Sequence, residues 1–121
     1  MNRALDINWN NIESTLSEHE TVFIDIWDPD NNTSNDFQPV FNKVSMEHKD
    51  LAFVRLNIQE QPDLTIALGV GDAPLLMVVK KRIDILQKSE RIEEQTLQDL
   101  IEVVREIDVD EIVLRACRDE D

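Results

Sequence analysis

Few side chains in this chain could carry out chemistry, and each lacks a partner that its chemistry needs. Ser34 could act as a nucleophile, but the two histidines, His19 and His48, fall at predicted helix ends away from it, so no general base is in view. The loop around it carries four residues spaced loosely like calcium ligands: Asp28, Asp30, Asn32 and Asp36. The central glycine and the terminal bidentate glutamate of an EF-hand are missing from this loop. These residues therefore predict no catalytic group, no metal site and no cofactor.

Cys117 and Asp25 are the other chemically notable residues. Cys117 is the single cysteine, so a disulfide within the chain is impossible, and the cytoplasm is the expected location. Asp25 lies in the apolar run from Thr21 to Trp27, where a charged carboxylate is costly unless it is paired. Because desolvation disfavours the charged form, we expect Asp25 to be buried with a raised pKa.

The apolar periodicity places these residues on alternating helices and strands. Apolar and β-branched runs predict strands at 21–27, 51–58, 74–79 and 83–87. Apolar residues at helical spacing predict helices before, between and after these strands. Trp9, Ile12 and Leu16 mark the first helix, and Phe37 begins the stripe of the second one after a polar loop at 28–36.

The resulting order, α-β-α-β-α-β-β-α, predicts an α/β fold with helices on both sides of a mixed central sheet, a three-layer α/β/α architecture. Beyond residue 107 the apolar stripe restarts out of phase, which predicts an extra short helix with a stripe of Val109, Ile112, Val113 and Ala116. We therefore expect a domain over 1–108 and an acidic helical extension over 109–121. The stripe must be buried against its own domain, a second copy or another protein.

The charge balance restricts the partners. The formal net charge is −14, from 12 Lys and Arg against 26 Asp and Glu. Such a field repels phosphate backbones and anionic lipid, so we expect neither nucleic acid nor membrane as a partner. No apolar run is long enough to span a bilayer, and the first residues lack the apolar segment of a signal peptide. The acidic excess either keeps the protein soluble or matches a basic partner.

Six residues together, at their particular spacing, resemble the thioredoxin family over about residues 7–106: Asp25, Trp27, Pro39, Asn57, Gly69 and Pro74. Asp25 and Trp27 match the end of the family's central strand, and Arg55 stands where its next strand has lysine. The resemblance implies the thioredoxin fold, a cis peptide bond before Pro74, and Arg55 as the charge partner of Asp25. It places five residues around the family's redox site: Asp25, Trp27, Pro39, Arg55 and Pro74.

The two redox cysteines of that family are absent. The motif Trp-Cys-Gly-Pro-Cys falls on Asp30-Asn31-Asn32-Thr33-Ser34, so Asn31 and Ser34 occupy the cysteine positions. A carboxamide and an unactivated hydroxyl cannot form a mixed disulfide, because that exchange needs a thiolate. Glu90 also stands where the family has a glycine in a substrate-facing loop. We therefore expect a degenerate redox site at Asn31, Asn32, Thr33 and Ser34, and a chain that is not an enzyme.

Two interpretations of these residues stay open. The segment 31–34 is either a loop and helix cap or a polar docking patch. Pro74 either fixes a turn or leaves main-chain groups that can pair with an extended peptide. Asp25 has lost the redox group it would serve, so we favour a structural role for it, and Trp27 is expected to belong to the core.

We therefore predict a redox-inactive thioredoxin-like domain that acts as a protein-binding or chaperone-like adaptor module. The alternative is a thioredoxin-fold enzyme of a non-dithiol type, which would act on a disulfide, glutathione or a peroxide. The expected partner is another protein or a second copy of the chain, without nucleic acid, membrane or metal.

Overall fold

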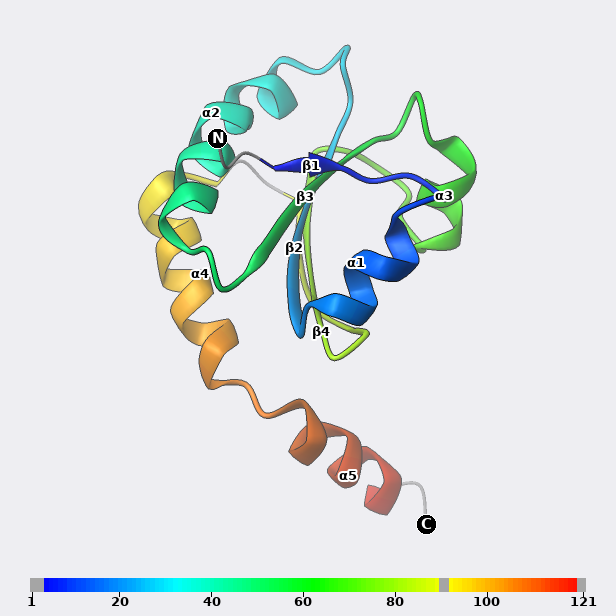
Figure 1. Cartoon of the computed structure of the whole chain (residues 1–121), viewed down its shortest axis with the longest axis vertical. Coiled ribbons are helices and arrows are strands. Elements are labelled where there is room, and N and C mark those ends of the chain that lie inside the picture. Colours follow the sequence, from blue (N-terminus) through cyan, green and yellow to red (C-terminus); the bar gives the residue numbers. More distant parts are fainter. Residues whose placement is uncertain (1–3, 90–91, 120–121) are drawn as a thin grey trace.

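The computed structural model describes residues 4–89 and 92–119, without the side chains of residues 32–35, 118 and 119. Its elements are β1 (Leu5–Asp6), α1 (Ile12–Glu18), β2 (Thr21–Trp27), α2 (Asn32–Glu47), β3 (Ala52–Asn57), α3 (Pro62–Ala67), β4 (Leu75–Lys80), β5 (Ile83–Lys88), α4 (Glu94–Glu106) and α5 (Val109–Asp119). The strands form one sheet in the order β1-β3-β2-β4-β5. The first three strands run parallel, and β4 and β5 are antiparallel to their neighbours. This mixed sheet with helices on both faces is the predicted fold class (Figure 1).

Alternation along the central strand β2 divides the core into two parts. On one face of the sheet, Ile24 belongs to a buried cluster with Ile12 of α1 and Leu64 of α3. On the other face, Phe23 belongs to a cluster with Phe41 of α2 and with residues of α4. Because successive side chains of a strand point to opposite faces, a strand buried on both faces is a continuous apolar run, as β2 is. Asp25 interrupts this run on the face that α2 and α4 cover.

The topology gathers the candidate site at one edge of the sheet. β2 and β3 are parallel, so the residues after Trp27 and after Asn57 leave the sheet on the same side. β4 is antiparallel to β2, so Pro74, just before its first residue, lies at that edge as well. The loop from β2 leads directly into α2. Residues 28–31, 58–61 and 71–74 therefore lie near one another.

The first helix is shorter than the sequence predicts. Trp9 was expected on its apolar stripe, but α1 begins at Ile12, and Trp9 precedes it with 56% of its surface exposed. Asparagine side chains explain the difference. The Asn8 Oδ1 accepts hydrogen bonds from the backbone N–H groups of Asn10 and Asn11, at 2.8 and 3.2 Å, and so holds a turn where the helix would have started.

The second helix is longer than predicted. Residues 28–36 were expected to form a loop, but α2 already begins at Asn32. Residues 32–35 are all polar in the sequence, so apolar periodicity could not detect this first turn. β1 was not predicted at all, because a strand of two residues carries no alternation.

A buried lysine fixes the C-terminal end of α4. Lys80, at the end of β4, is 7% exposed, and its Nζ donates to the carbonyl oxygens of Val104 and Ile107, both at 2.7 Å. The Val104 carbonyl lies in the last turn of α4 and also accepts from the backbone N–H of Ile107, which directly follows the helix. Lys80 thus ties the sheet to the corner between α4 and α5.

Replacing Lys80 by methionine is expected to lower the free energy of unfolding by about 2 kcal/mol, because it removes the buried hydrogen bonds from the Nζ to the carbonyls of Val104 and Ile107. Urea unfolding monitored by circular dichroism measures the change. Lys81→Met is the matched control, because Lys81 is exposed and pairs with the exposed Asp110. That variant is expected to change stability by less than about 0.5 kcal/mol. Equal losses in both variants would show that the carbonyl contacts of Lys80 do not matter.

Candidate functional site

The candidate site begins with a buried ion pair between neighbouring strands. Asp25 and Arg55 stand opposite each other in the parallel pair of β2 and β3. The Arg55 Nε donates to the Asp25 Oδ2 at 3.0 Å, and the two side chains are 6% and 2% exposed. Arg55 is therefore the partner of Asp25 that the family resemblance implied.

The environment of Asp25 shifts the pKa of its carboxyl group. Burial raises the pKa of Asp25 to about 6, although the charge and the hydrogen bond of Arg55 act in the opposite direction. Desolvation prevails because the carboxylate accepts only the bond from Arg55 among the side chains of the described residues. Asp25 is therefore buried and has a raised pKa, as the sequence predicts.

Trp27 covers the other side of the arginine. The Arg55 Cζ lies 4.2 Å from the centroid of the Trp27 ring, a cation–π contact. Within the described residues, the Arg55 Nη2 and the Trp27 Nε1 are buried without a hydrogen-bond partner. The indole face thus takes the place of a second hydrogen-bonding partner for the guanidinium. Trp27 itself is half-buried, so it belongs to the rim of the core.

Two cavities reach the arginine end of this cluster. One, of ≈ 290 Å³, is lined by Asp6 of β1, Gln38 and Asn42 of α2, and Arg55. The other, of ≈ 360 Å³, is lined by Trp27, Arg55, Asn57 and Glu60, among others. Arg55 therefore borders solvent-sized space, whereas Asp25 lines neither cavity.

A polar bridge holds the loop that precedes α2. The Gln59 Nε2 donates to the Asp28 Oδ1 and to the Asp30 Oδ2, both at 2.8 Å. Within the loop, the backbone N–H of Asn31 donates to the carbonyl of Asp28 at 3.0 Å. The loop is therefore fixed from two sides. Gln59 could not be predicted from the sequence, because a residue 29 to 31 positions away from its partners leaves no local signal.

The structure places residues 31–34, the segment expected to be a degenerate redox site, at the start of α2. Asn31 precedes the helix, and Asn32, Thr33 and Ser34 form its first turn. The side chains of Asn32, Thr33 and Ser34 lie outside the described part of the chain, as does Glu90. Pro39 lies inside α2 on its exposed side. Pro39 is therefore outside the cluster of Asp25, Trp27 and Arg55.

The segment before β4 completes this edge. The peptide bond between Ala73 and Pro74 is cis, and Gly69 has a φ of 78° after the last turn of α3. Gly71 and Asp72 are exposed, and Ala73 and Pro74 are half-buried. In the described part of the chain, the main-chain groups of Gly71, Asp72 and Ala73 take part in no backbone hydrogen bond. The main-chain N–H and carbonyl groups of this stretch are therefore available for hydrogen bonds to a partner.

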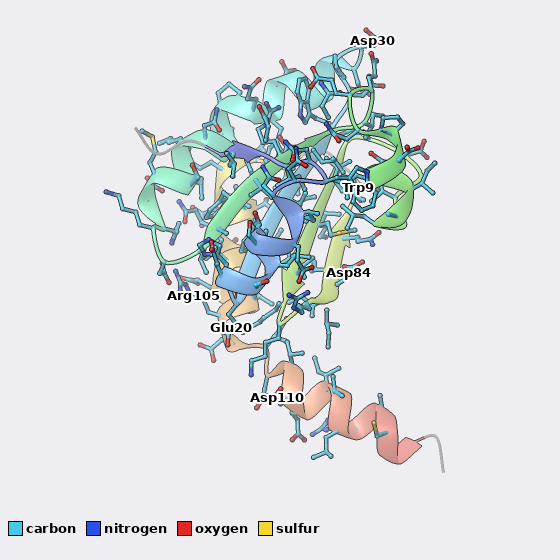
Figure 2. All side chains as sticks on the ribbon, turned by 45° about the vertical axis from the view of Figure 1, so that its right-hand side comes forward. Trp9, Glu20, Asp30, Asp84, Arg105 and Asp110 are labelled. Atoms are coloured by element: carbon cyan, nitrogen blue, oxygen red, sulfur yellow. The ribbon has the colours of Figure 1, made fainter. Side chains whose placement is uncertain are left out.

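The exposed side chains around this edge are acidic. Asp30, Glu60 and Asp72 are all exposed, and Figure 2 shows Asp30 at the end of the molecule opposite Glu20. Among the residues that the structure describes, no group of three or more His, Cys, Asp or Glu could hold a metal ion. No helix in the described ranges is long and apolar enough to cross a membrane.

The predicted interface residues on α5 separate into two groups. Val109 is buried, with 2% of its surface exposed. Ile112 and Val113 are 50% and 42% exposed, and Ala116 is exposed as well. The four residues therefore do not act together: the first anchors the helix to its own domain, and the others face solvent.

Comparison with known proteins supports the family. The sequence profile of the family described as Thioredoxin matches residues 4–106. A Streptomyces coelicolor protein that carries the name thioredoxin 2 is 29% identical over 112 residues, which cover 93% of this chain and 84% of that protein.

Solved structures show the same fold. A thioredoxin variant from Halobacterium salinarum superposes with a TM-score of 0.79 at 21% identity, covering 88% of this chain and 94% of the other. Plasmodium falciparum thioredoxin superposes with a TM-score of 0.74 at 17% identity, covering 82% of this chain and 97% of the other.

These names correct one expectation. From Asn31 and Ser34 we expected a chain that is not an enzyme. The relatives contradict this, because they are named thioredoxins, which are disulfide oxidoreductases, and they place the chain in a family of redox enzymes. With the profile matching most of its length, this chain belongs to the thioredoxin family.

Proposed function

We propose that this member of the thioredoxin family is a cytoplasmic protein-binding adaptor that holds an extended polypeptide segment against residues 71–73. The observation that carries the proposal is the free main chain of Gly71, Asp72 and Ala73 beside Pro74. Extended peptides bind such stretches by adding main-chain hydrogen bonds, as in other cases of strand addition.

The neighbouring loop supports this role. Because Gln59 bridges Asp28 and Asp30, the loop before α2 is held in place before any polypeptide arrives. A surface that is already ordered loses less conformational entropy on binding. The adaptor would therefore bind with a rigid loop on one side of the peptide and the start of β4 on the other.

The residue types at 31–34 favour non-covalent binding of a polypeptide over thiol–disulfide exchange with it. Neither Asn31 nor Ser34 provides a thiol, so a bound segment would not be attached through a mixed disulfide at these positions. The exposed carboxylates of Asp30, Glu60 and Asp72 favour segments that carry lysine or arginine. The proposed client is therefore an extended, basic stretch of polypeptide.

A peptide titration tests the proposal. A short unstructured peptide rich in lysine and serine, and a matched peptide with glutamate in place of lysine, are added to the ¹⁵N-labelled chain. The lysine peptide is expected to shift the amide resonances of Gly71, Asp72 and Ala73, because alternate N–H groups of this stretch become donors to the peptide and the intervening one lies beside it. The glutamate peptide is expected to bind more weakly. Shifts that leave these three amides unchanged would contradict the proposal.

Matched charge reversals provide the control. Asp72→Lys is expected to weaken binding of the lysine peptide by about threefold or more, because it places a like charge beside it. Glu20→Lys makes the same change of charge just before β2, at the end of the sheet away from Asp30 (Figure 2), and is expected to leave binding within about twofold. Equal weakening by the two variants would mean that only the net charge matters.

A further inference from the structure

The base of α5 is firmly attached to the domain. Val109 is buried, and the Lys81 Nζ lies 2.7 Å from the Asp110 Oδ2. The Asp108 Oδ1 accepts a hydrogen bond from the backbone N–H of Glu111 at 3.0 Å and so caps the first turn. The carbonyl of Ile107, just before this turn, accepts the bond from Lys80. The direction of α5 is therefore set by contacts at its first turn.

The rest of α5 projects away from the domain (Figure 1). Ile112, Val113 and Leu114 are consecutive, and 50%, 42% and 49% of their surfaces are exposed. Ile112, Val113 and Ala116 share one side of the helix, because residues one, three and four apart lie within about 100° of one another. A soluble chain rarely leaves such a stripe on a projecting helix without a partner.

We propose that this stripe packs against the same stripe of a second copy of the chain, with the two α5 helices antiparallel. The charges on the helix support this partner. Its first turn is acidic, with Asp110 and Glu111 after the capping Asp108, and Arg115 follows one turn later, where its Nε also pairs with the Glu111 Oε1 of the same helix at 2.9 Å. An antiparallel pair brings the acidic turn of one helix toward Arg115 of the other. A parallel pair would set like charges side by side.

The net charge of the whole chain also favours the antiparallel arrangement. Each copy carries −14, so the two domains repel each other. In an antiparallel pair the domains sit at opposite ends of a helix of 11 residues, which is about 16 Å long. That exceeds the screening length of about 8 Å at physiological salt. A parallel pair would place both domains at the same end.

The size of the contact predicts a transient dimer. One short helix from each copy buries less than the roughly 1,200 Å² of stable complexes. The association is therefore expected to depend on protein concentration in the micromolar to millimolar range.

Sedimentation velocity of the full chain tests the proposal. The weight-average sedimentation coefficient is expected to rise with concentration between about 10 µM and about 1 mM. Ile112→Asp is expected to weaken association by about tenfold or more, since it puts a charge into the apolar contact. Ile66→Asp is the matched control, because Ile66 of α3 is 73% exposed and lies outside α5. A chain that stays monomeric throughout, or an association that survives Ile112→Asp, would overturn the proposal.

Two further measurements test the orientation. Glu111→Lys and Arg115→Glu are each expected to weaken the dimer, and an equimolar mixture of the two variants is expected to restore it, because each then faces an opposite charge. With the stripes centred on Val113, which sets Glu111 of one copy level with Arg115 of the other, the two Cys117 residues are offset by about 12 Å along the antiparallel pair, beyond the reach of a disulfide. Mild oxidation is therefore expected to leave the dimer without a disulfide. A Cys117-linked dimer, or single variants that associate like the wild type, would rule out the antiparallel pairing.

Discussion

Replacing Asn31 and Ser34 together by cysteine is expected to give the chain a disulfide reductase activity that neither single replacement gives. Both positions lie at the start of α2, where the helix dipole lowers the pKa of a thiol and favours the reactive thiolate. The first cysteine would attack a substrate disulfide, and the second would release the product by forming the internal disulfide. The polypeptide-holding edge proposed above would then present substrates to a working dithiol.

Insulin reduction with a dithiol donor measures this gain. All variants carry Cys117→Ser, so the introduced cysteines are the only thiols in the chain. The double variant is expected to exceed each single variant by about tenfold or more. A double variant as inactive as the single ones would show that the surroundings no longer support exchange. Insulin reduction by the Cys117→Ser chain without new cysteines would contradict the redox-inactive adaptor and reveal a redox route outside positions 31 and 34.

The stability of the wild-type chain is expected to fall as the pH rises from 4 to 7, and much of this fall is expected to disappear in Asp25→Asn. The folded pKa of Asp25 is about 6, above the value of about 3.9 expected in the unfolded chain. The folded state therefore holds the proton more tightly than the unfolded state. The stabilisation that this tighter proton binding gives the folded state is fully present below pH 4 and is lost as the pH rises through 6. Two pKa units correspond to about 3 kcal/mol at neutral pH.

Urea unfolding of the two proteins at several pH values between 4 and 7 provides the measurement. The difference in free energy of unfolding between Asp25→Asn and the wild type is expected to grow across this range, because asparagine stays neutral and its oxygen can still accept from Arg55. Asp72→Asn is the matched control at an exposed position, and its difference from the wild type is expected to stay nearly constant. A constant difference for Asp25→Asn would mean that Asp25 titrates as it does in the unfolded chain.

Much of the fold could be predicted because its buried strands are nearly continuous apolar runs. The runs around Phe23, Phe53 and Val78 each became a strand close to the expected bounds. The helix boundaries were less predictable, because polar residues decide them. Asn8 formed a turn that excluded Trp9 from α1, and the polar first turn of α2 gave no apolar signal.

The site could be predicted where the polarity of one residue differs from that of its neighbours. A carboxylate at position 25 in an apolar strand indicated burial and a partner, and the resemblance to thioredoxin supplied Arg55. The bridge from Gln59 to Asp28 and Asp30 could not be predicted in this way, because all three residues are ordinary loop residues. The buried Lys80 was missed for a related reason: its acceptors are main-chain carbonyls, which no side-chain pattern encodes.

Because β1 is only two residues long, the negative net charge of the chain has a further consequence. β1 covers only Val54 and Arg55 of β3, so the remainder of β3 has no strand partner on that side within the described residues. An uncovered strand edge is a template on which other chains can add, and proteins guard such edges with charge. Here the net charge of −14 repels the sheet edge of one copy from that of another at neutral pH. This net charge vanishes near the isoelectric point of ≈ 4.3, so acidification removes the electrostatic barrier to edge-to-edge aggregation.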